Sequence, residues 1–321
     1  MRLLPVARMF MNTKKIKIIF NPNAGKLHAL QDTIDFITGE NLNTNTCNLH
    51  PDQCLHSLVD CLKSKGFSCE MDICRSYYEA KACAGRCSKE KYLLVIAAGG
   101  DGTVNSVING IAESSTALGI LPTGSSNIFI RQSALPHSVK SICDLLDKPD
   151  FKQVDLGRID GRYFINMTGI GIKEYMPRRD RFSIFEFIKY FLIGFENIFS
   201  YPLRKIIVKI DNSDRIYNGH LLLIGNGKYY GSSIPFAFKA QMDDGLLDLI
   251  IFKTANFVRI LQIIYRLKNK TPSVFKGFEY FQAKKIIIKG PANHPVLVDG
   301  ESFHPTPAEI SVVPRGLKII C

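Results

Sequence analysis

The clearest chemistry in this sequence is offered by a short glycine-rich stretch around one carboxylate. Gly99-Gly100-Asp101-Gly102-Thr103 follows an apolar run and precedes a stretch with helical spacing. Glycines let backbone N–H groups approach phosphate oxygens, and the positive end of a following helix favours an anion. A carboxylate inside such an anion site needs a cation beside it, so we expect Asp101 to face magnesium or to act in catalysis. The alternative is a plain strand-to-helix turn that Asp101 caps.

Two more polar loops follow strand-like runs. They are Asn21-Pro22-Asn23-Ala24-Gly25-Lys26 and Leu121-Pro122-Thr123-Gly124-Ser125-Ser126-Asn127. Loops that follow parallel strands meet at the carboxyl edge of a sheet, where such folds bind their ligands. None of the three loops is a Walker A motif, because Gly25-Lys26 lacks both the earlier glycine and the following Ser or Thr. The three loops together predict a nucleotide site of another design.

The elements that must position these loops alternate between strands and helices over residues 14–150. Strands are expected at 15–20, 67–74, 92–98 and 118–121, and helices at 53–64, 79–90 and 104–112. This alternation predicts an α/β domain with a mostly parallel sheet. Over residues 151–306, short strand-like runs separated by Gly, Asn, Asp and Pro predict a second, largely antiparallel β domain. Residues 1–13 are expected to form a disordered leader.

Composition narrows the classes of protein that fit. The 321 residues are 46% hydrophobic and 22% charged, which is typical of a folded globular chain and excludes global disorder. With 41 Lys and Arg against 29 Asp and Glu, the net charge of +12 predicts an anionic partner: a nucleotide, a membrane surface or nucleic acid. The positive charge is the only feature that favours nucleic-acid binding, and no recognition motif accompanies it. We therefore expect no nucleic acid to bind. No uncharged apolar run of about 18 residues occurs, so no transmembrane helix is expected.

The nine cysteines are odd in number, and their spacing never forms Cys-x-x-Cys. This pattern favours reduced thiols in a cytoplasmic protein over a disulfide framework or a zinc site.

Taken together, the loops resemble the catalytic domain shared by soluble bacterial diacylglycerol kinases, related bacterial lipid kinases, sphingosine kinases and ceramide kinases. Further matching motifs follow in the order of that family over almost the whole chain: Val154-Asp155-Leu156-Gly157, Tyr163-Phe164-Ile165-Asn166, Gly169-Ile170-Gly171, Gly225-Asn226-Gly227-Lys228-Tyr229-Tyr230-Gly231, Met242-Asp243-Asp244-Gly245-Leu246-Leu247-Asp248 and Val298-Asp299-Gly300-Glu301. A lone Gly-Gly-Asp-Gly motif is weak evidence for the family, because other kinases also carry it. The whole set of motifs in this order is specific for the family.

The resemblance implies an ATP-dependent lipid kinase with an NAD kinase-like α/β domain, a C-terminal β-sandwich-like domain and an active site in the cleft between them. It also implies that residues 307–321 return to complete the first domain. By this resemblance, the residues expected to bind ATP are Asn21, Pro22, Asn23, Ala24, Gly25, Cys74, Gly100, Asp101, Gly102, Thr103, Val104, Asn105, Ser106 and Ser125. A structural magnesium ion is expected at Gln241, Asp244 and Leu246, the first and last through their carbonyls.

The same resemblance assigns the catalytic carboxylates. Glu301 matches the acceptor of the hydroxyl proton, Asp155 a further active-site carboxylate, and Asp101 the group beside magnesium. Taken alone, Asp299-Gly300 is typical of a hairpin turn. Relatives often carry Glu at position 106 and Asp at position 128, and they differ over residues 171–174, which leaves the substrate open.

A lipid substrate implies peripheral contact with an anionic membrane surface. The aromatic run at 182–201 fits either a helix at the acyl-chain entrance or an ordinary core helix. The rival functions are a dinucleotide kinase and an inactive membrane-binding protein on the same fold. The sequence leaves the oligomeric state open, with a homodimer among the options.

Overall fold

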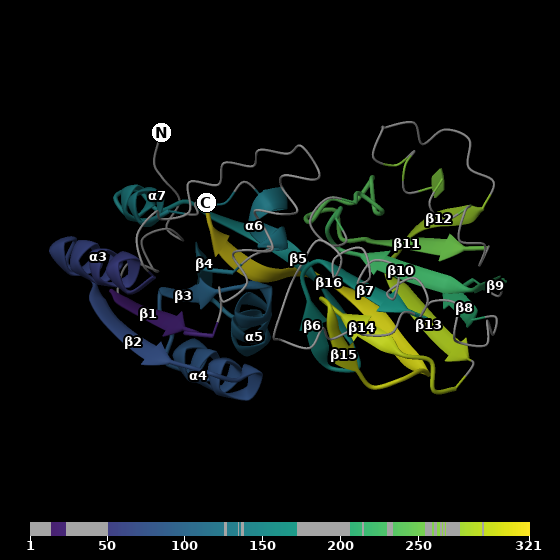
Figure 1. Ribbon diagram of the computed structural model, residues 1–321, viewed down its shortest axis with the longest axis horizontal. Coiled ribbons are helices and arrows are strands. Elements are labelled where there is room, and N and C mark those ends of the chain that lie inside the picture. The colour runs from purple at the N-terminus through teal and green to yellow at the C-terminus, as the bar shows by residue number, and fades with distance from the viewer. Residues whose placement is uncertain are drawn as a thin grey trace, which may run out of the picture. The chain divides into compact units, whose positions relative to one another are not determined.

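The computed structural model describes residues 14–23, 51–124, 127–133, 135, 138–171, 206–213, 215–229, 234–253, 259, 262–263, 265, 267, 277–290 and 292–321. It divides into two compact units, unit 1 with residues 1–154 and 315–321 and unit 2 with residues 155–314 (Figure 1). The leader expected at 1–13 and the aromatic run at 182–201 lie outside the described residues.

A parallel sheet forms the centre of unit 1. Its strands are β2 (Ser68–Ile73), β1 (Lys15–Phe20), β3 (Leu94–Gly99) and β4 (Ala117–Pro122), in that order, with the last residues of β16 (Ala308–Ile320) parallel to β4. Each residue of β3 and β4 is buried, as expected for strands covered on both faces. The predicted α/β class is confirmed for this part of the chain.

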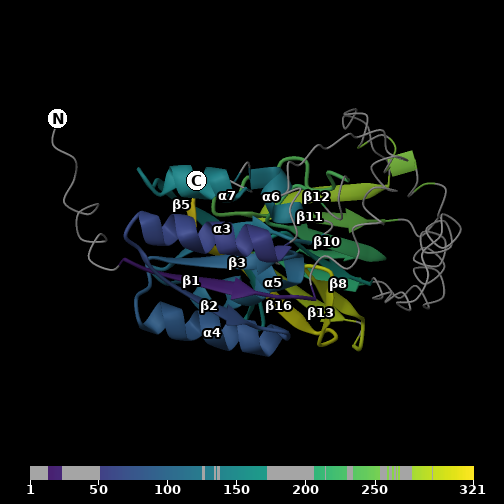
Figure 2. The same cartoon turned by 60° about the vertical axis from the view of Figure 1, so that its left-hand side comes forward.

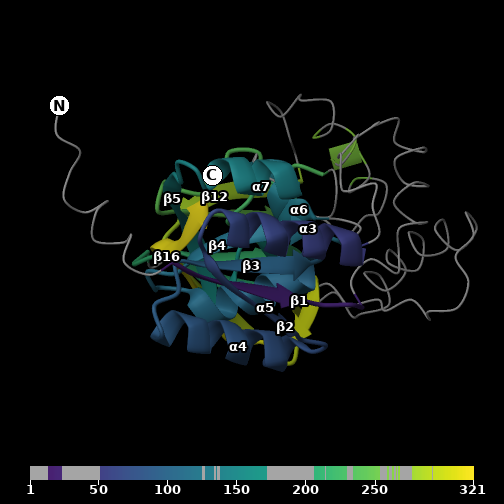
Figure 3. The same cartoon turned by 90° about the vertical axis from the view of Figure 1, so that its left-hand side faces the viewer.

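Helices cover both faces of that sheet. They are α3 (Pro51–Ser64), α4 (Tyr77–Lys89), α5 (Asp101–Ile111), α6 (Ile128–Ser133) and α7 (Val139–Leu145). Helices α3 and α7 lie on one face and α4 and α5 on the other (Figures 2 and 3). Apolar side chains of α3 and α7 share a core with β1 and β3, which includes Leu58, Ile142 and Ile96.

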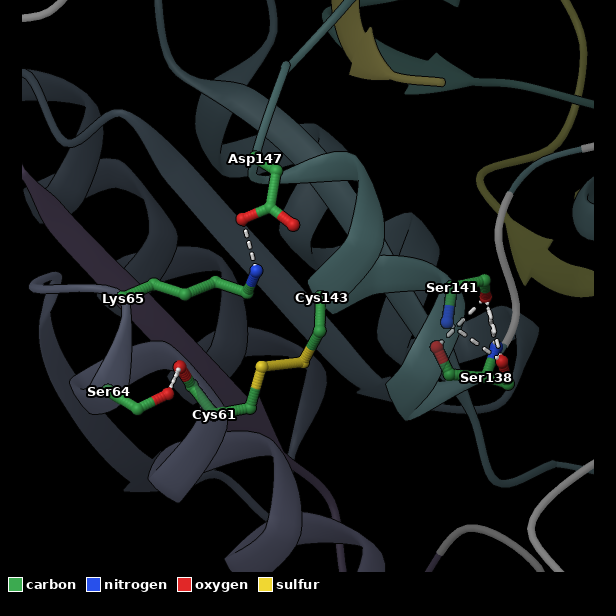
Figure 4. The surroundings of a disulfide bond; sticks show 7 residues. All are labelled: Cys61, Ser64, Lys65, Ser138, Ser141, Cys143 and Asp147. Atoms are coloured by element: carbon green, nitrogen blue, oxygen red, sulfur yellow. Dashed lines mark hydrogen bonds and ion pairs between the residues drawn. A yellow bond between two sulfur atoms is a disulfide. The ribbon is translucent and has the colours of Figure 1, made fainter.

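A disulfide joins two of the helices on one face of this sheet. Cys61 of α3 is bonded to Cys143 of α7, 82 residues further along the chain, and Lys65 forms an ion pair with Asp147 beside it (Figure 4). The expectation of reduced thiols is therefore wrong for this pair. Residue spacing could not reveal it, because the helix packing is what brings the two Cα atoms to 6.5 Å. Cys69, Cys74, Cys83, Cys87 and Cys321 are free thiols.

Unit 2 is built from antiparallel strands in two sheets. The strands are β5 (Phe151–Ile159), β6 (Arg162–Phe164), β7 (Met167–Ile170), β8 (Ile206–Ile210), β9 (Ile216–Gly219), β10 (Leu221–Gly225), β11 (Leu247–Phe252), β12 (Phe278–Ala283), β13 (Lys285–Gly290), β14 (Val296–Val298), β15 (Glu301–Phe303) and the first part of β16. One sheet runs β16-β13-β8-β9 and the other β12-β11-β10-β7-β14-β15. One apolar core contains side chains of both sheets, among them Val208, Ile288, Leu222 and Leu249. The predicted antiparallel, sandwich-like class is confirmed.

Candidate active site

The glycine-rich stretch of unit 1 connects the end of β3 to the first turn of a helix. Helix α5 begins at Asp101, three residues before the predicted start, and Gly100 occupies its N-cap position without a side-chain hydrogen bond. Asp101 is therefore the first helical residue and not the cap, so the alternative of a cap at Asp101 is wrong. A carboxylate in the first turn is stabilised by the positive end of the helix. Because glycine has no side chain, the N-cap residue itself offers no acceptor to the N–H groups in the first turn of α5.

Two glycines bring the loops after β3 and β4 together. A Cβ atom on Gly124 would lie 2.4 Å from the Cα atom of Gly100, so the two backbones are in direct contact. The Asp101 Oδ1 accepts a hydrogen bond from the Ile128 N–H at 2.8 Å. Asp101 thereby links α5 to α6 through the backbone of the residue that is often Asp in relatives.

The loop after β1 meets the same turn. The Asn21 side chain donates to the Thr103 Oγ1 at 3.2 Å, and its own Oδ1 accepts from the Asn23 N–H at 3.0 Å. The Asn21 N–H also donates to the Ala98 carbonyl at the end of β3. The described parts of the three predicted loops therefore lie at one sheet edge, as the order of parallel strands requires. Ala24, Gly25 and Ser125, which complete the predicted set, lie outside the described residues.

Several predicted nucleotide-binding side chains are already engaged within the helix. Val104, Asn105 and Ser106 are buried, the Ser106 Oγ donates to the Gly102 carbonyl at 2.7 Å, and the Asn105 side chain accepts from Asn109. In this arrangement their side chains stabilise α5, whereas Gly102 is exposed. Pro22 and Asn23 form the turn after β1.

Cys74 follows β2 at the same edge, where its N–H donates to the Phe20 carbonyl at 2.9 Å. The side chain is buried, and burial raises the pKa of its thiol. It is an uncharged thiol at a position where relatives use a hydroxyl.

In unit 2, Asp155 fastens a loop that precedes β11. Its Oδ2 accepts from the Gly245 N–H at 2.6 Å, and its own N–H donates to the Met242 carbonyl at 2.6 Å. The residue is buried, so the hydrogen bond from the Gly245 N–H replaces part of the water that its carboxylate loses. Asp155 therefore holds in place the loop that contains the predicted magnesium ligands.

That loop contains Gln241, Asp244 and Leu246, the three residues predicted to bind magnesium. The Asp244 Oδ1 accepts from the Leu246 N–H at 3.0 Å, and Gln241 is exposed. Partial burial, together with the negative charges of Asp155 and Asp243, raises the pKa of Asp244. A bound cation would relieve this repulsion, and oxygen ligands suit magnesium. Within the described parts of the chain, no three His, Cys, Asp or Glu side chains converge on a metal position.

Asp248, a few residues further on, is an ionisable group that was not among the predicted site residues. It is fully buried, and its Oδ1 accepts from the Tyr280 hydroxyl at 2.5 Å. Burial raises the pKa of Asp248 to about 6.

Glu301 follows a tight turn between β14 and β15. Asp299 and Gly300 both have positive φ, 48° and 87°, and Val298 pairs with Glu301, so the hairpin interpretation of Asp299-Gly300 is confirmed. The Asp299 carboxylate accepts three backbone N–H groups at 2.9 to 3.0 Å, those of Ile165, Asn166 and Met167. Asp299 is therefore the residue that fixes this turn.

Glu301 forms an ion pair with Arg162 of β6 through its Oε2. Arg162 was not among the predicted site residues, although Asp160-Gly161-Arg162 repeats the pattern of Asp299-Gly300-Glu301. The structure describes Asp101 in unit 1 and Asp155 and Glu301 in unit 2. None of the helices in the described part of the chain is long and apolar enough to cross a bilayer.

Comparison with known families accounts for most of the chain. Residues 42–159 match the diacylglycerol kinase catalytic domain, and residues 177–321 match the YegS C-terminal NAD kinase beta sandwich-like domain.

Several known diacylglycerol kinases align with most of this chain. A diacylglycerol kinase of Staphylococcus epidermidis is 31% identical over 245 residues, which cover 74% of this chain and 76% of the relative. One from Staphylococcus saprophyticus is 29% identical over 90% of this chain and 89% of its own length. A crystal structure of a diacylglycerol kinase from Bacillus anthracis has the same fold, with a TM-score of 0.65, 24% identity and 97% of each chain covered.

Proposed function

This chain belongs to the diacylglycerol kinase family and is a lipid kinase, and from that premise we propose that it transfers the γ-phosphate of ATP to diacylglycerol or to a related glycerolipid or sphingoid lipid. The observation that carries the proposal is the glycine N-cap of α5, where Gly100 packs on Gly124 at the carboxyl edge of a parallel sheet. Backbone N–H groups and a helix dipole at such an edge are suited to phosphate.

We assign nucleotide binding to residues 14–150, completed by 307–321, and lipid binding to residues 151–306. The hydrogen bond between the side chains of Asn21 and Thr103 holds the loop after β1 against the first turn of α5. Bound magnesium would neutralise phosphate charge, with Asp101 beside it at the nucleotide and with Gln241, Asp244 and Leu246 at a structural position.

The proposed transfer needs an acceptor for one proton. The lipid hydroxyl oxygen bonds to the γ-phosphorus, the bond from that phosphorus to the β-phosphate oxygen breaks, ADP leaves, and the hydroxyl proton passes to Glu301. Asp155 contributes by holding the 241–246 loop through Gly245 and Met242.

Access to such a lipid requires the protein to meet a membrane surface. We propose peripheral contact with anionic lipid, which the net charge of +12 supports.

The function is tested with ATP labelled at the γ-phosphate, magnesium and mixed vesicles, each containing one candidate: diacylglycerol, phosphatidylglycerol, a sphingoid base or a glycolipid. We expect label in at least one lipid and none in NAD, which is included to test for a dinucleotide kinase. Asp101→Asn, which keeps the side-chain shape and an acceptor for the Ile128 N–H, is expected to stay folded and to lose at least about 100-fold in rate. Transfer to NAD, or to no acceptor at all, would overturn the proposal.

A further inference from the structure

Two hairpins of unit 2 share one design and place oppositely charged residues against each other. The turn between β5 and β6 is Asp160-Gly161, with φ values of 43° and 86°, and the turn between β14 and β15 is Asp299-Gly300. The first strand residue after each turn is Arg162 in one hairpin and Glu301 in the other. These two residues form the ion pair.

The two partners differ in how firmly the protein holds them. The Arg162 side chain is 13% exposed, and its guanidinium lies over the Phe303 ring at 5.6 Å from the ring centre. This stacking fixes the cation independently of the carboxylate. The Glu301 side chain is 42% exposed and would sample many rotamers without a partner. The firmly held Arg162 therefore restricts the conformation of the Glu301 side chain.

The contact also distinguishes the two carboxylate oxygens. Arg162 binds Oε2 of Glu301, and Oε1 lies outside this contact. A guanidinium that holds one oxygen leaves the other in a defined direction. We propose that Arg162 is the positioning residue that presents Oε1 of Glu301 to the hydroxyl of the lipid acceptor. This inference rests on the proposed role of Glu301 as the proton acceptor.

A purely structural clamp between β6 and β15 is the competing explanation. A clamp would affect stability and the binding of both substrates, whereas a positioning residue affects kcat and acts only through Glu301. The two explanations are therefore separable by kinetics in two backgrounds, the wild type and Glu301→Gln.

The experiment measures kcat, the KM values for ATP and for lipid, and the thermal midpoint of the full chain. The lipid is the acceptor identified in the vesicle panel. The variants are Arg162→Met, Arg162→Lys, Glu301→Gln and the double variant Arg162→Met with Glu301→Gln. Lys285→Gln serves as the matched control, because it removes a cation from another ion pair of unit 2, that with Glu309 at 2.8 Å.

We expect Arg162→Met to lower kcat by about 10- to 100-fold, part of what a positioned base contributes, with the KM for ATP within about twofold of the wild type. Arg162→Lys keeps the charge without the planar fork and should restore part of the rate. In the Glu301→Gln background, Arg162→Met should cause no further loss. Lys285→Gln should leave all parameters unchanged.

Phe303→Leu keeps the rate test informative if Arg162→Met does not fold, because it removes the ring under the guanidinium while both charges remain. We expect kcat to fall by about threefold. Wild-type kcat in Arg162→Met would overturn the inference. If Arg162→Met does not fold, wild-type kcat in Phe303→Leu would overturn it instead. So would an equal loss from Arg162→Met in both backgrounds. Wild-type kcat in Glu301→Gln would instead remove the proposed role of Glu301 and the inference with it.

Discussion

The two units position their candidate site groups by different means. In unit 1 the candidate phosphate site is made from backbone: Gly100 and Gly124 touch, and the N-cap residue of α5 is a glycine, which has no side chain to cap the helix. In unit 2 the candidate groups are carboxylates that backbone N–H groups or a cation hold, as with Asp155, Asp299 and Glu301. Unit 1 should therefore be sensitive to added bulk, and unit 2 to lost charge or lost acceptors.

The sharpest test of the backbone site is Gly124→Ala. The new Cβ would lie 2.4 Å from the Gly100 Cα, so the loops must separate. We expect ATP affinity to fall at least about 10-fold, measured by titration calorimetry. Gly85→Ala in α4 is the matched control, because its nearest neighbour would be 3.8 Å away, and it should bind ATP normally. Unchanged affinity in Gly124→Ala would mean that the close approach does not matter for the nucleotide.

The carboxylate side of the comparison is tested at Asp299. Asp299→Ala leaves the three N–H groups of Ile165, Asn166 and Met167 without their acceptor. We expect the free energy of unfolding to fall by at least about 3 kcal/mol, measured with denaturant. Asp299→Asn keeps one oxygen, and Asn tolerates positive φ, so its loss should be about 1 kcal/mol. Equal losses in the two variants would show that the acceptors are not what holds the turn.

A smaller effect is expected from the buried carboxyl of Asp248. Its pKa is about 6 in the folded protein, above the ordinary value of 3.8, so the folded state holds this proton more tightly. The stabilisation by the neutral carboxyl is complete below the ordinary value and is lost as pH rises through about 6. Between about pH 5 and about pH 7.5 we expect a loss near 1 kcal/mol that Asp248→Asn abolishes. The same pH dependence of the free energy of unfolding in the wild type and in Asp248→Asn would contradict this role of Asp248.

Much of the fold and part of the site could be predicted from sequence. Strand β1 and the order of the loops followed from apolar runs that end in turn residues, because such runs are strong local patterns. The start of α5 was missed, since glycines normally argue against a helix and the packing on Gly124 compensates for them here. The partnership of Arg162 with Glu301 and the bond from Cys61 to Cys143 join residues 139 and 82 positions apart, which only tertiary packing brings together.

The most direct test of the account is Glu301→Gln, with ATP binding and phosphate transfer measured on the same preparation. The side chain keeps its size, so we predict wild-type affinity for ATP and a transfer rate to lipid lowered at least about 100-fold. Transfer at the wild-type rate in this variant would contradict the central claim that Glu301 accepts the proton of the lipid hydroxyl.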